Sequence, residues 1–469
     1  MPLQSEQVAK TAFARLRTAP QSHTARAVRS GSPVNSKPAK GWPGWTWKEE
    51  FPSPAPVPPL EAGHAFIPDT LSRATSRRYN TAPNSGPEGA QPIAAEQETQ
   101  SPAHDTLDST FIVDADVHVH ESPTEMAEYA TDPWDVALRE IGKVDERYLD
   151  LPGMSPRAEY RTPFPGGSNR PQIVTSAGAM RAELSQLHVD TAVLFPDHLL
   201  FLAMVRDPLF AVELARTYNA WLFERWLTEQ PTLKGALVIA PQDPRAGAED
   251  IRRYTGKREW ACVYLPASGV RPLYGHHSYD PIYEAAVETG LPVCIHSVEA
   301  VYPAFPFQLE VFQTSMAQHC IAHPFAMMAN IVSMIETAVP VRFPDLKIGI
   351  MEAGITWVPF IINRLDKEYL ERRREVPLLQ DRPSHYIREW YFGTQPIEEP
   401  ERRGDIVKIF ELFDGANRAM FASDWPHHDF DHPQHVFGLP FSPEARRNIM
   451  GGNAARFFNL DKPNEVAGG

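Results

Sequence analysis

Histidine and carboxylate side chains stand at the ends of four apolar segments of this sequence. The first segment runs into the motif DADVHVH, which places His118 and His120 two positions apart. The other three segments end at His296, Glu352 and Asp424. Imidazole and carboxylate groups together suit divalent metals such as zinc, manganese and iron. Each residue alone is more typical of an ordinary hydrogen-bonding side chain, so the four ends predict a metal centre only if the fold brings them together.

Eight short apolar runs of β type are the elements that must position these residues. They cover residues 111–116, 191–195, 235–240, 262–265, 292–296, 347–352, 390–394 and 419–424. Segments of helical periodicity cover residues 177–187, 209–228, 244–254, 281–289, 326–337, 357–374, 405–413 and 443–458. Buried strands that alternate with helices are typical of parallel sheets, and eight such units predict an α/β fold, the (β/α)8 TIM barrel. The C-terminal ends of barrel strands meet at one mouth, and strand alternation turns His118 and His120 to one face.

The distribution of proline predicts how the chain divides. Proline occurs 46 times in 469 residues, nearly double the usual share of roughly 5%, and 15 of these prolines precede Thr110. We expect residues 1–110 to form an extended or disordered arm, because their apolar islands bury too little surface to offset the entropy of ordering. Residues 111–460 are then the barrel domain and residues 461–469 a tail.

A long insertion at residues 121–175 separates the first strand from its helix. It leaves the barrel on the side where loops build active sites, so we expect a lid or a substrate-recognition flap. Arg157, Arg161 and Arg170 in this insertion are candidates to bind a substrate carboxylate. A solvated surface position is the alternative for each of them.

Charge, cysteine content and hydropathy exclude several classes of protein. The formal net charge is −14, which argues against binding to a nucleic-acid backbone. The three cysteines show no CxxC spacing, as is usual in a reducing compartment. No apolar run approaches the roughly 18 residues of a membrane span. We therefore expect a soluble, cytoplasmic protein that binds neither nucleic acid nor membrane.

The motifs together resemble a known family. The segments DADVHVHES, PVCIHS, RFPDLKIGIMEAGITWVPFIINRLD and FASDWPHHDFDHP look like the amidohydrolase-related family (amidohydrolase family 2) typified by aminocarboxymuconate-semialdehyde decarboxylase. The resemblance covers about residues 111–460 and implies the barrel and a catalytic divalent metal, Zn2+ or Mn2+/Fe2+. Carried over by position, it implies that His118, His120, His296 and Asp424 hold the metal. It also implies that Asp424 can manage a proton.

The chain departs from the family pattern at two strands. The fourth run has no lysine that could be carbamylated to bridge two metals. At the end of the sixth run, Glu352 stands where the prototype has a histidine that activates water. Glu352 is a candidate general acid or base, or a ligand for a second metal together with His296, His319 or His323. A purely structural Glu352 is the alternative, and His319 and His323 are equally candidates for orienting or helix-capping roles.

Other residues near these motifs are candidates for supporting roles. Asp116 and Glu121 are expected to orient the first-strand imidazoles, with ordinary surface hydrogen bonding as the alternative. His427 and His428 follow Asp424 closely and are candidates to line the mouth and contact substrate, although we expect at least one of them to face solvent.

These observations predict a metal-dependent decarboxylase or hydrolase that acts on a small aromatic or unsaturated carboxylate. Asp424, Glu352 and His296 are the expected catalytic residues. Two alternatives stay open at this point. One is an oxygen-dependent hydroxylase with a dinuclear Fe or Fe/Mn site, and the other is a non-catalytic partner subunit of a hetero-oligomer. For the enzyme itself we expect a homodimer or a larger assembly.

Overall fold

The fold was analysed in a computed structural model that describes residues 106–143, 173–298 and 311–461. Nearly all of the predicted N-terminal arm, the tail from residue 462 and the lid arginines Arg157, Arg161 and Arg170 lie outside the described residues. Two short helices, α1 (Pro123–Met126) and α2 (Trp134–Ile141), occupy the part of the 121–175 insertion that the structure describes.

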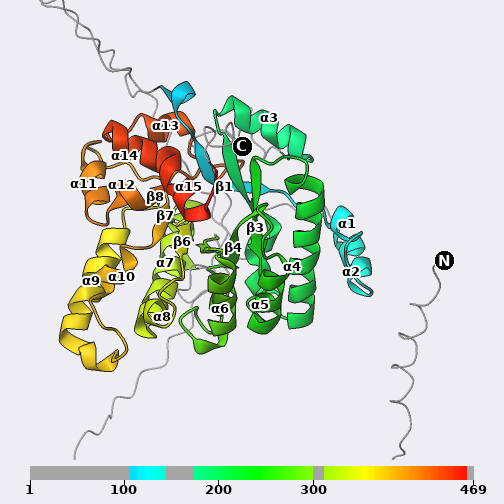
Figure 1. Cartoon of the computed structure of the whole chain (residues 1–469), viewed down its shortest axis with the longest axis horizontal. Coiled ribbons are helices and arrows are strands. Elements are labelled where there is room, and N and C mark those ends of the chain that lie inside the picture. Colours follow the sequence, from blue (N-terminus) through cyan, green and yellow to red (C-terminus); the bar gives the residue numbers. More distant parts are fainter. Residues whose placement is uncertain (1–105, 144–172, 299–310, 462–469) are drawn as a thin grey trace, which may run out of the picture. The chain divides into compact units, whose positions relative to one another are not determined.

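Eight parallel strands form one sheet, in the same order as in the sequence (Figure 1). They are β1 (Val113–Val119), β2 (Thr191–Pro196), β3 (Leu233–Val238), β4 (Trp260–Pro266), β5 (Val293–His296), β6 (Ile348–Met351), β7 (Tyr391–Gly393) and β8 (Ala419–Met420). Each falls on one of the eight apolar runs, so the predicted strands and their parallel arrangement are confirmed, with ends shifted by a few residues.

The segment that follows β8 pairs with β1 and closes the sheet into a barrel. The amide of Ala115 donates to the carbonyl of Phe421 at 2.9 Å, and the amide of Asp424 donates to the carbonyl of Asp116 at 2.9 Å. A parallel bridge also joins Val117 to Trp425. The predicted TIM barrel is therefore confirmed, and the seam between its first and last strands includes two of the predicted site residues.

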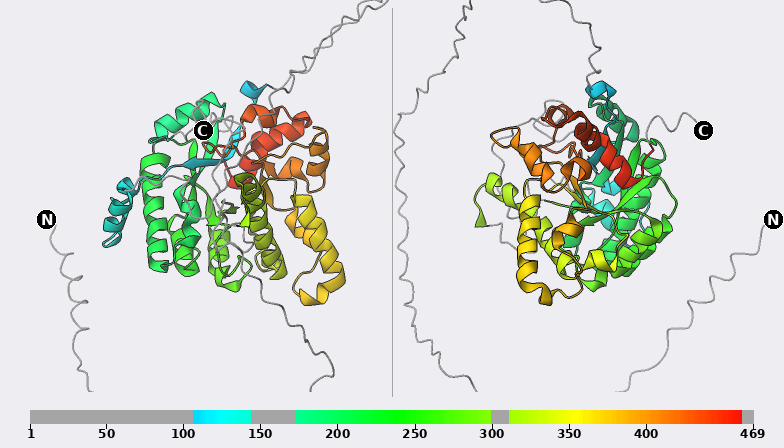
Figure 2. Two further views of the ribbon diagram at one scale, coloured as in Figure 1. Left: turned by 180° about the vertical axis from the view of Figure 1, so that it is seen from behind. Right: turned by 60° about the vertical axis from the view of Figure 1, so that its left-hand side comes forward.

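Helices lie around the outside of the strands (Figure 2). The longer ones are α3 (Ala177–Gln186), α4 (Pro208–Leu222), α5 (Pro244–Arg253), α6 (Asp280–Thr289), α7 (Ser315–Glu336), α9 (Val358–Arg372) and α11 (Asp405–Glu411). The shorter ones are α8 (Val339–Arg342), α10 (Pro383–Ile387), α12 (Gly415–Arg418), α13 (Pro433–Phe437), α14 (Pro443–Arg447) and α15 (Asn453–Phe458). No helix in the described part of the chain is long and apolar enough to cross a membrane.

Capping side chains explain where several helices begin. The Asp207 carboxylate accepts the backbone N–H of Leu209, and Pro208 occupies the first position of α4. Asp243 caps α5 in the same way. Each carboxylate satisfies an amide that has no partner inside the helix, and proline at the first turn loses no helical hydrogen bond.

The strands are buried on both faces, as expected when helices cover a parallel sheet. All seven residues of β1 are buried, including Asp114, Asp116 and His118. The polar side chains therefore lie inside an otherwise apolar barrel. Because burying an unpaired polar group is costly, each of them needs a partner.

Helix α7 is longer than predicted. It begins at Ser315 and continues through Pro324, whereas the sequence analysis expected a helix over residues 326–337. The Thr314 hydroxyl accepts the backbone N–H of Ala317 and caps the helix well before the predicted start. His319 and His323 therefore lie one turn apart on a single helix, and their rings are 4.8 Å apart.

Alanine substitutions at two glycines test how closely the C-terminal segment packs against the barrel. A Cβ added at Gly451, in the π-helical segment η8 (Asn448–Gly452), would lie 2.3 Å from the carbonyl oxygen of Phe111, just before β1. Gly451→Ala should therefore cost about 1–3 kcal/mol of unfolding free energy, as overpacking does. Gly178→Ala in α3 meets nothing within 4 Å, so it should be neutral or slightly stabilising. Urea unfolding of both variants checks this, and equal stabilities would contradict the packing.

Candidate metal centre

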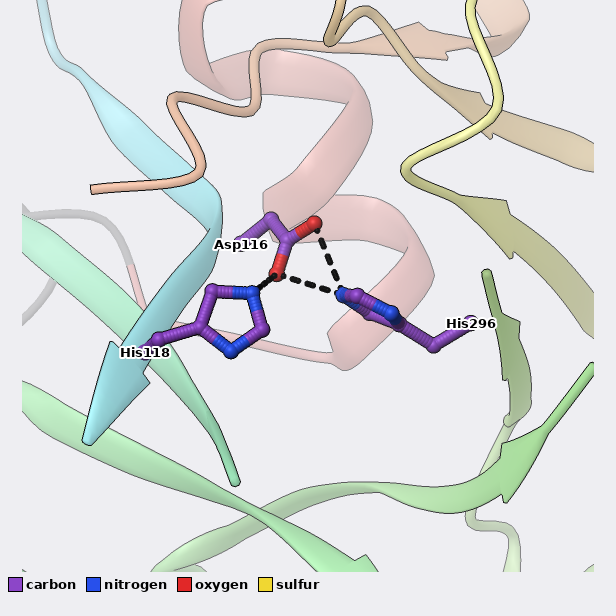
Figure 3. Close-up of side chains that lie close together, drawn as sticks. All are labelled: Asp116, His118 and His296. Atoms are coloured by element: carbon purple, nitrogen blue, oxygen red, sulfur yellow. Dashed lines mark hydrogen bonds and ion pairs between the residues drawn. The ribbon is translucent and has the colours of Figure 1, made fainter. Parts of the chain in front are cut away.

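Three buried side chains from opposite sides of the barrel meet at its centre (Figure 3). Asp116 and His118 come from β1, and His296 is the last residue of β5. The Nε2 atom of His296 lies 3.0 and 3.1 Å from the two carboxylate oxygens of Asp116. The Nε2 atom of His118 lies 3.5 Å from one of these oxygens. All three side chains are at most 1% exposed.

Backbone carbonyls determine which ring nitrogens face this cluster. The Nδ1 atom of His118 lies 2.7 Å from the carbonyl oxygen of Pro196, and the Nδ1 atom of His296 lies 2.7 Å from that of Ser297. A carbonyl oxygen can only accept a hydrogen bond, so both Nδ1 atoms carry the hydrogen. In the neutral rings, both Nε2 atoms then present lone pairs towards carboxylates. Either a proton on the ring or a bound cation makes this arrangement favourable.

Asp424 adds a second carboxylate to the cluster. One of its oxygens lies 2.9 Å from Nε2 of His118 and 2.7 Å from Nδ1 of His427. Its other oxygen accepts a hydrogen bond of 3.1 Å from the side-chain amide of Gln395. The ring of His427 stacks on His118, with 4.2 Å between ring centroids. Asp424 therefore connects the buried cluster to the residues at the mouth.

The electrostatics around Asp424 favour its charged form. Burial alone would raise the pKa of Asp424, but the nearby His427 and the hydrogen bonds from the two histidines outweigh burial and lower it. The pKa of His427 is well above its usual value, because the attraction of Asp424 and Asp197 overcomes the effect of burial. Two imidazoles and two carboxylates, Asp116 and Asp424, make a nitrogen and oxygen donor set suited to Mn2+, Fe2+ or Zn2+.

Glu352 stands beside this cluster at the end of β6. Its Oε2 atom lies 3.3 Å from Nδ1 of His296, and its Oε1 atom lies 3.7 Å from Nδ1 of His323. Burial, reinforced by the negative charge of Asp424, raises the pKa of Glu352 well above its usual value. The raised pKa favours the acid form of Glu352, which can donate a proton, next to the predicted metal ligands.

Glu352 and Asp424 also share an unusual backbone conformation. Their φ angles are 49° and 62°, in the left-handed region. A residue with a side chain pays roughly 1–3 kcal/mol to stay there, and such residues concentrate at functional sites. Glu352 directly follows β6, and Asp424 lies four positions after the end of β8, so a strained residue that carries a carboxyl group follows each strand.

His120 and Glu121 occupy places other than those expected. β1 ends at Val119, and the ring of His120 turns to Asp197, with 2.9 Å between Nδ1 and Oδ2, and to His198. The carboxylate of Glu121 accepts the backbone N–H groups of Asp197, His198 and Leu199 at 2.8 to 3.2 Å. Glu121 thus holds the loop after β2 and contacts neither imidazole ring through these bonds. His120 shares a cluster with Asp197 and His198 instead of with His118.

The remaining predicted histidines lie around the same mouth. His319 Nε2 is 3.1 Å from Asp429 Oδ2, and His428 Nδ1 is 3.1 Å from Asp429 Oδ1. His323 is buried behind His319. The side chains of His427 and His428 are only 17% and 16% exposed, so neither faces solvent fully, contrary to expectation.

Sequence reasoning missed Asp197, Gln395 and Asp429. Asp197 directly follows β2, so its position at a strand end was a usable signal. Gln395 follows β7 in the same way, but its amide side chain is not a typical metal ligand. Asp429 lies in the motif HHDFD and was hidden among neighbouring acidic and imidazole groups.

Comparisons with known proteins identify the family of this chain. The family model of the amidohydrolases matches residues 115–460. A gamma-resorcylate decarboxylase from Polaromonas sp. is 24% identical over 276 residues, which cover 55% of this chain and 80% of the relative. Another from Rhizobium sp. is 25% identical over 272 residues, which cover 54% of this chain and 77% of the relative.

Solved structures share the fold. The 5-carboxyvanillate decarboxylase from Sphingomonas paucimobilis aligns with a TM-score of 0.56 and 22% identity, over 75% of this chain and 100% of that one. A dihydroxybenzoic acid decarboxylase from Polaromonas sp., solved with manganese and 2-nitroresorcinol, aligns with a TM-score of 0.54 and 17% identity, over 76% and 99%. The family model spans well over half of this sequence, and the chain therefore belongs to the amidohydrolase family.

Proposed function

We propose that this protein is a metal-dependent decarboxylase of a small aromatic carboxylate. Asp116, His118, His296 and Asp424 hold the divalent metal, and Glu352 is the proton donor. The observation that carries the proposal is the buried Glu352 carboxyl group, which lies 3.3 Å from Nδ1 of His296 and whose pKa burial raises. Decarboxylation requires an acid at the carbon that loses CO2, whereas hydrolysis requires a base.

The donor set of the site fits a divalent ion. The Nε2 atoms of two imidazoles and two carboxylates converge in a buried space. When bound there, the ion supplies positive charge that holds a carboxylate substrate and stabilises negative charge on its oxygen atoms. Two related decarboxylase structures contain bound manganese, which supports this choice of cofactor.

The chain's own residues account for the proton and electron balance. Glu352 gives its proton to the ring carbon that bears the carboxylate. The bond between that carbon and the carboxylate then breaks, its electron pair restores the aromatic ring, and CO2 leaves. Glu352 regains a proton from solvent, so one turnover consumes one carboxylate and one proton. Burial of Glu352 favours the acid form that begins each turnover.

His427 contributes positive charge at the mouth. Its carboxylate neighbours Asp424 and Asp197 hold its pKa well above the usual value despite burial, so it stays an imidazolium at neutral pH. Its side chain is 17% exposed and can meet an arriving carboxylate. Its two N–H groups face Asp424 and Asp197, so it attracts an anionic substrate through its charge.

The relatives favour decarboxylation over the other reactions considered. The curated relatives described above are named gamma-resorcylate decarboxylases, and the solved ones act on carboxyvanillate and dihydroxybenzoate. These names give no support to the oxygen-dependent hydroxylase. The hydroxylated benzoates are therefore the first substrate class to test.

Glu352→Gln tests the proton donor. The amide keeps the size of the side chain but cannot supply the proton, so kcat should fall by about 10²–10⁴-fold, the usual contribution of general acid catalysis. Metal content should stay unchanged. Release of CO2 from a panel of hydroxybenzoates measures the rate. Glu288→Gln, which alters an exposed ion pair with Arg252, is the matched control. Wild-type turnover in Glu352→Gln would refute the assignment.

Substitutions of Asp116 and His120 should change metal affinity by different amounts. Asp116→Asn removes a charged donor from the buried cluster, so Mn2+ affinity should fall by more than the roughly 10–100-fold that follows loss of an orienting partner. His120→Gln should change it by less than this, because His120 pairs with Asp197 instead. Mn2+ titration of each purified protein decides between them. A larger loss of Mn2+ affinity in His120→Gln than in Asp116→Asn would mean that His120, and not Asp116, is the metal ligand.

A further inference from the structure

We propose that a second divalent cation binds between His319, His428 and Asp429, at the same mouth as the first. Their ligand atoms lie within 4.8 Å of one another. Both imidazoles contact the Asp429 carboxylate, each at 3.1 Å and each at a different oxygen. One carboxylate between two imidazoles is a recurrent donor arrangement for Zn2+ and similar ions.

His323 provides independent support for the site. It is 3% exposed, and neither of its ring nitrogens has a hydrogen-bond partner among the described residues. Its ring lies 4.8 Å from that of His319, one turn along α7. A buried imidazole without a partner is costly, and a nearby cation would satisfy it.

Two rigid elements present the donors. His319 and His323 come from α7, and their spacing of four residues places them on one face of the helix. His428 and Asp429 come from the loop between β8 and α13, close to Asp424. The donors of the second site thus come from a long helix and from the loop that also carries a ligand of the first.

Two side chains connect the proposed sites. The Gln395 amide lies 3.1 Å from Asp424 Oδ2 and 3.5 Å from Asp429 Oδ2, so it contacts one carboxylate of each. Glu352 lies between His296 and His323. The two ions would therefore share one mouth, and the substrate would meet both.

The two sites differ in the chemistry of their donors. The first combines two carboxylates with two imidazoles, whereas the second combines one carboxylate with two imidazoles and a third ring close by. Nitrogen-rich sites favour Zn2+ over Mg2+ and Ca2+, and oxygen-rich sites suit Mn2+. Zn2+ is therefore the probe for the second site.

The experiment counts Zn2+ ions per full-length chain after equilibration with Zn2+ and removal of free metal. The wild type should hold two. The variant Asp116→Asn/His118→Ala lacks donors of the first site and should hold one. Adding His428→Ala and Asp429→Asn to that variant should leave none. His385→Ala, an exposed histidine paired with Asp381, is the matched control and should change nothing.

Each count has a definite meaning. One ion in the wild type would overturn the proposal, as would an ion that survives the combined substitutions. Circular dichroism identifies any variant that fails to fold, and the milder pair His319→Gln and His428→Gln then replaces it. The ion count is independent of the substrate, so failure of the proposed decarboxylation would leave this result intact. Likewise, failure of the second-ion proposal would leave the proposed decarboxylation intact.

Discussion

Two backbone carbonyls control the chemistry of this barrel. The carbonyl oxygens of Pro196 and Ser297 each accept a hydrogen bond from Nδ1 of a buried histidine. The opposite nitrogen of each ring therefore faces the carboxylates of Asp116 and Asp424. The Nε2 atoms and the carboxylates therefore lie together in the buried interior of the barrel. Neighbouring features follow from this constraint, because each buried charge needs a further partner: Gln395 and His427 for Asp424, and Asp197 for His427. The polar network therefore extends from the centre to the rim.

This network places groups of opposite protonation state close together. Asp424 and Asp429 are held as carboxylates, because neighbouring imidazoles outweigh the effect of burial on each pKa. Glu352 lies in the same mouth, but there burial outweighs the charge of His427 and raises the pKa, which favours the acid form. A single enclosed space thus contains both strong anions and a neutral acid. Environments that separate the pKa values of similar groups are how enzymes divide acid from base roles.

The sequence allowed the fold to be predicted, but the details of the site less completely. Eight apolar runs were enough for the barrel, because its strands are short, buried and separated by helices. Strand ends also located His118, His296 and Asp424. The sequence did not show whether Asp116 or His120 joins His118 in the buried cluster, since alternation puts both on one face of the strand. What separates them is where pairing stops: Val119 pairs with Pro196 as the last partner of β1. Likewise, the continuation of α7 through Pro324 depends on the Thr314 cap and on tertiary packing, which periodicity does not report.

The seam between β1 and β8 has a consequence for how the protein matures. Asp114 and Ser423 meet across this seam although 309 residues separate them, and the donors of the first site lie on both sides of it. A ribosome must complete almost the whole barrel before these donors can meet. The complete set of donors proposed for the ion therefore exists only in chains whose first and last strands have joined. Once bound, it stabilises that joined state by mass action. Occupancy of the site would then report that synthesis and closure are both complete.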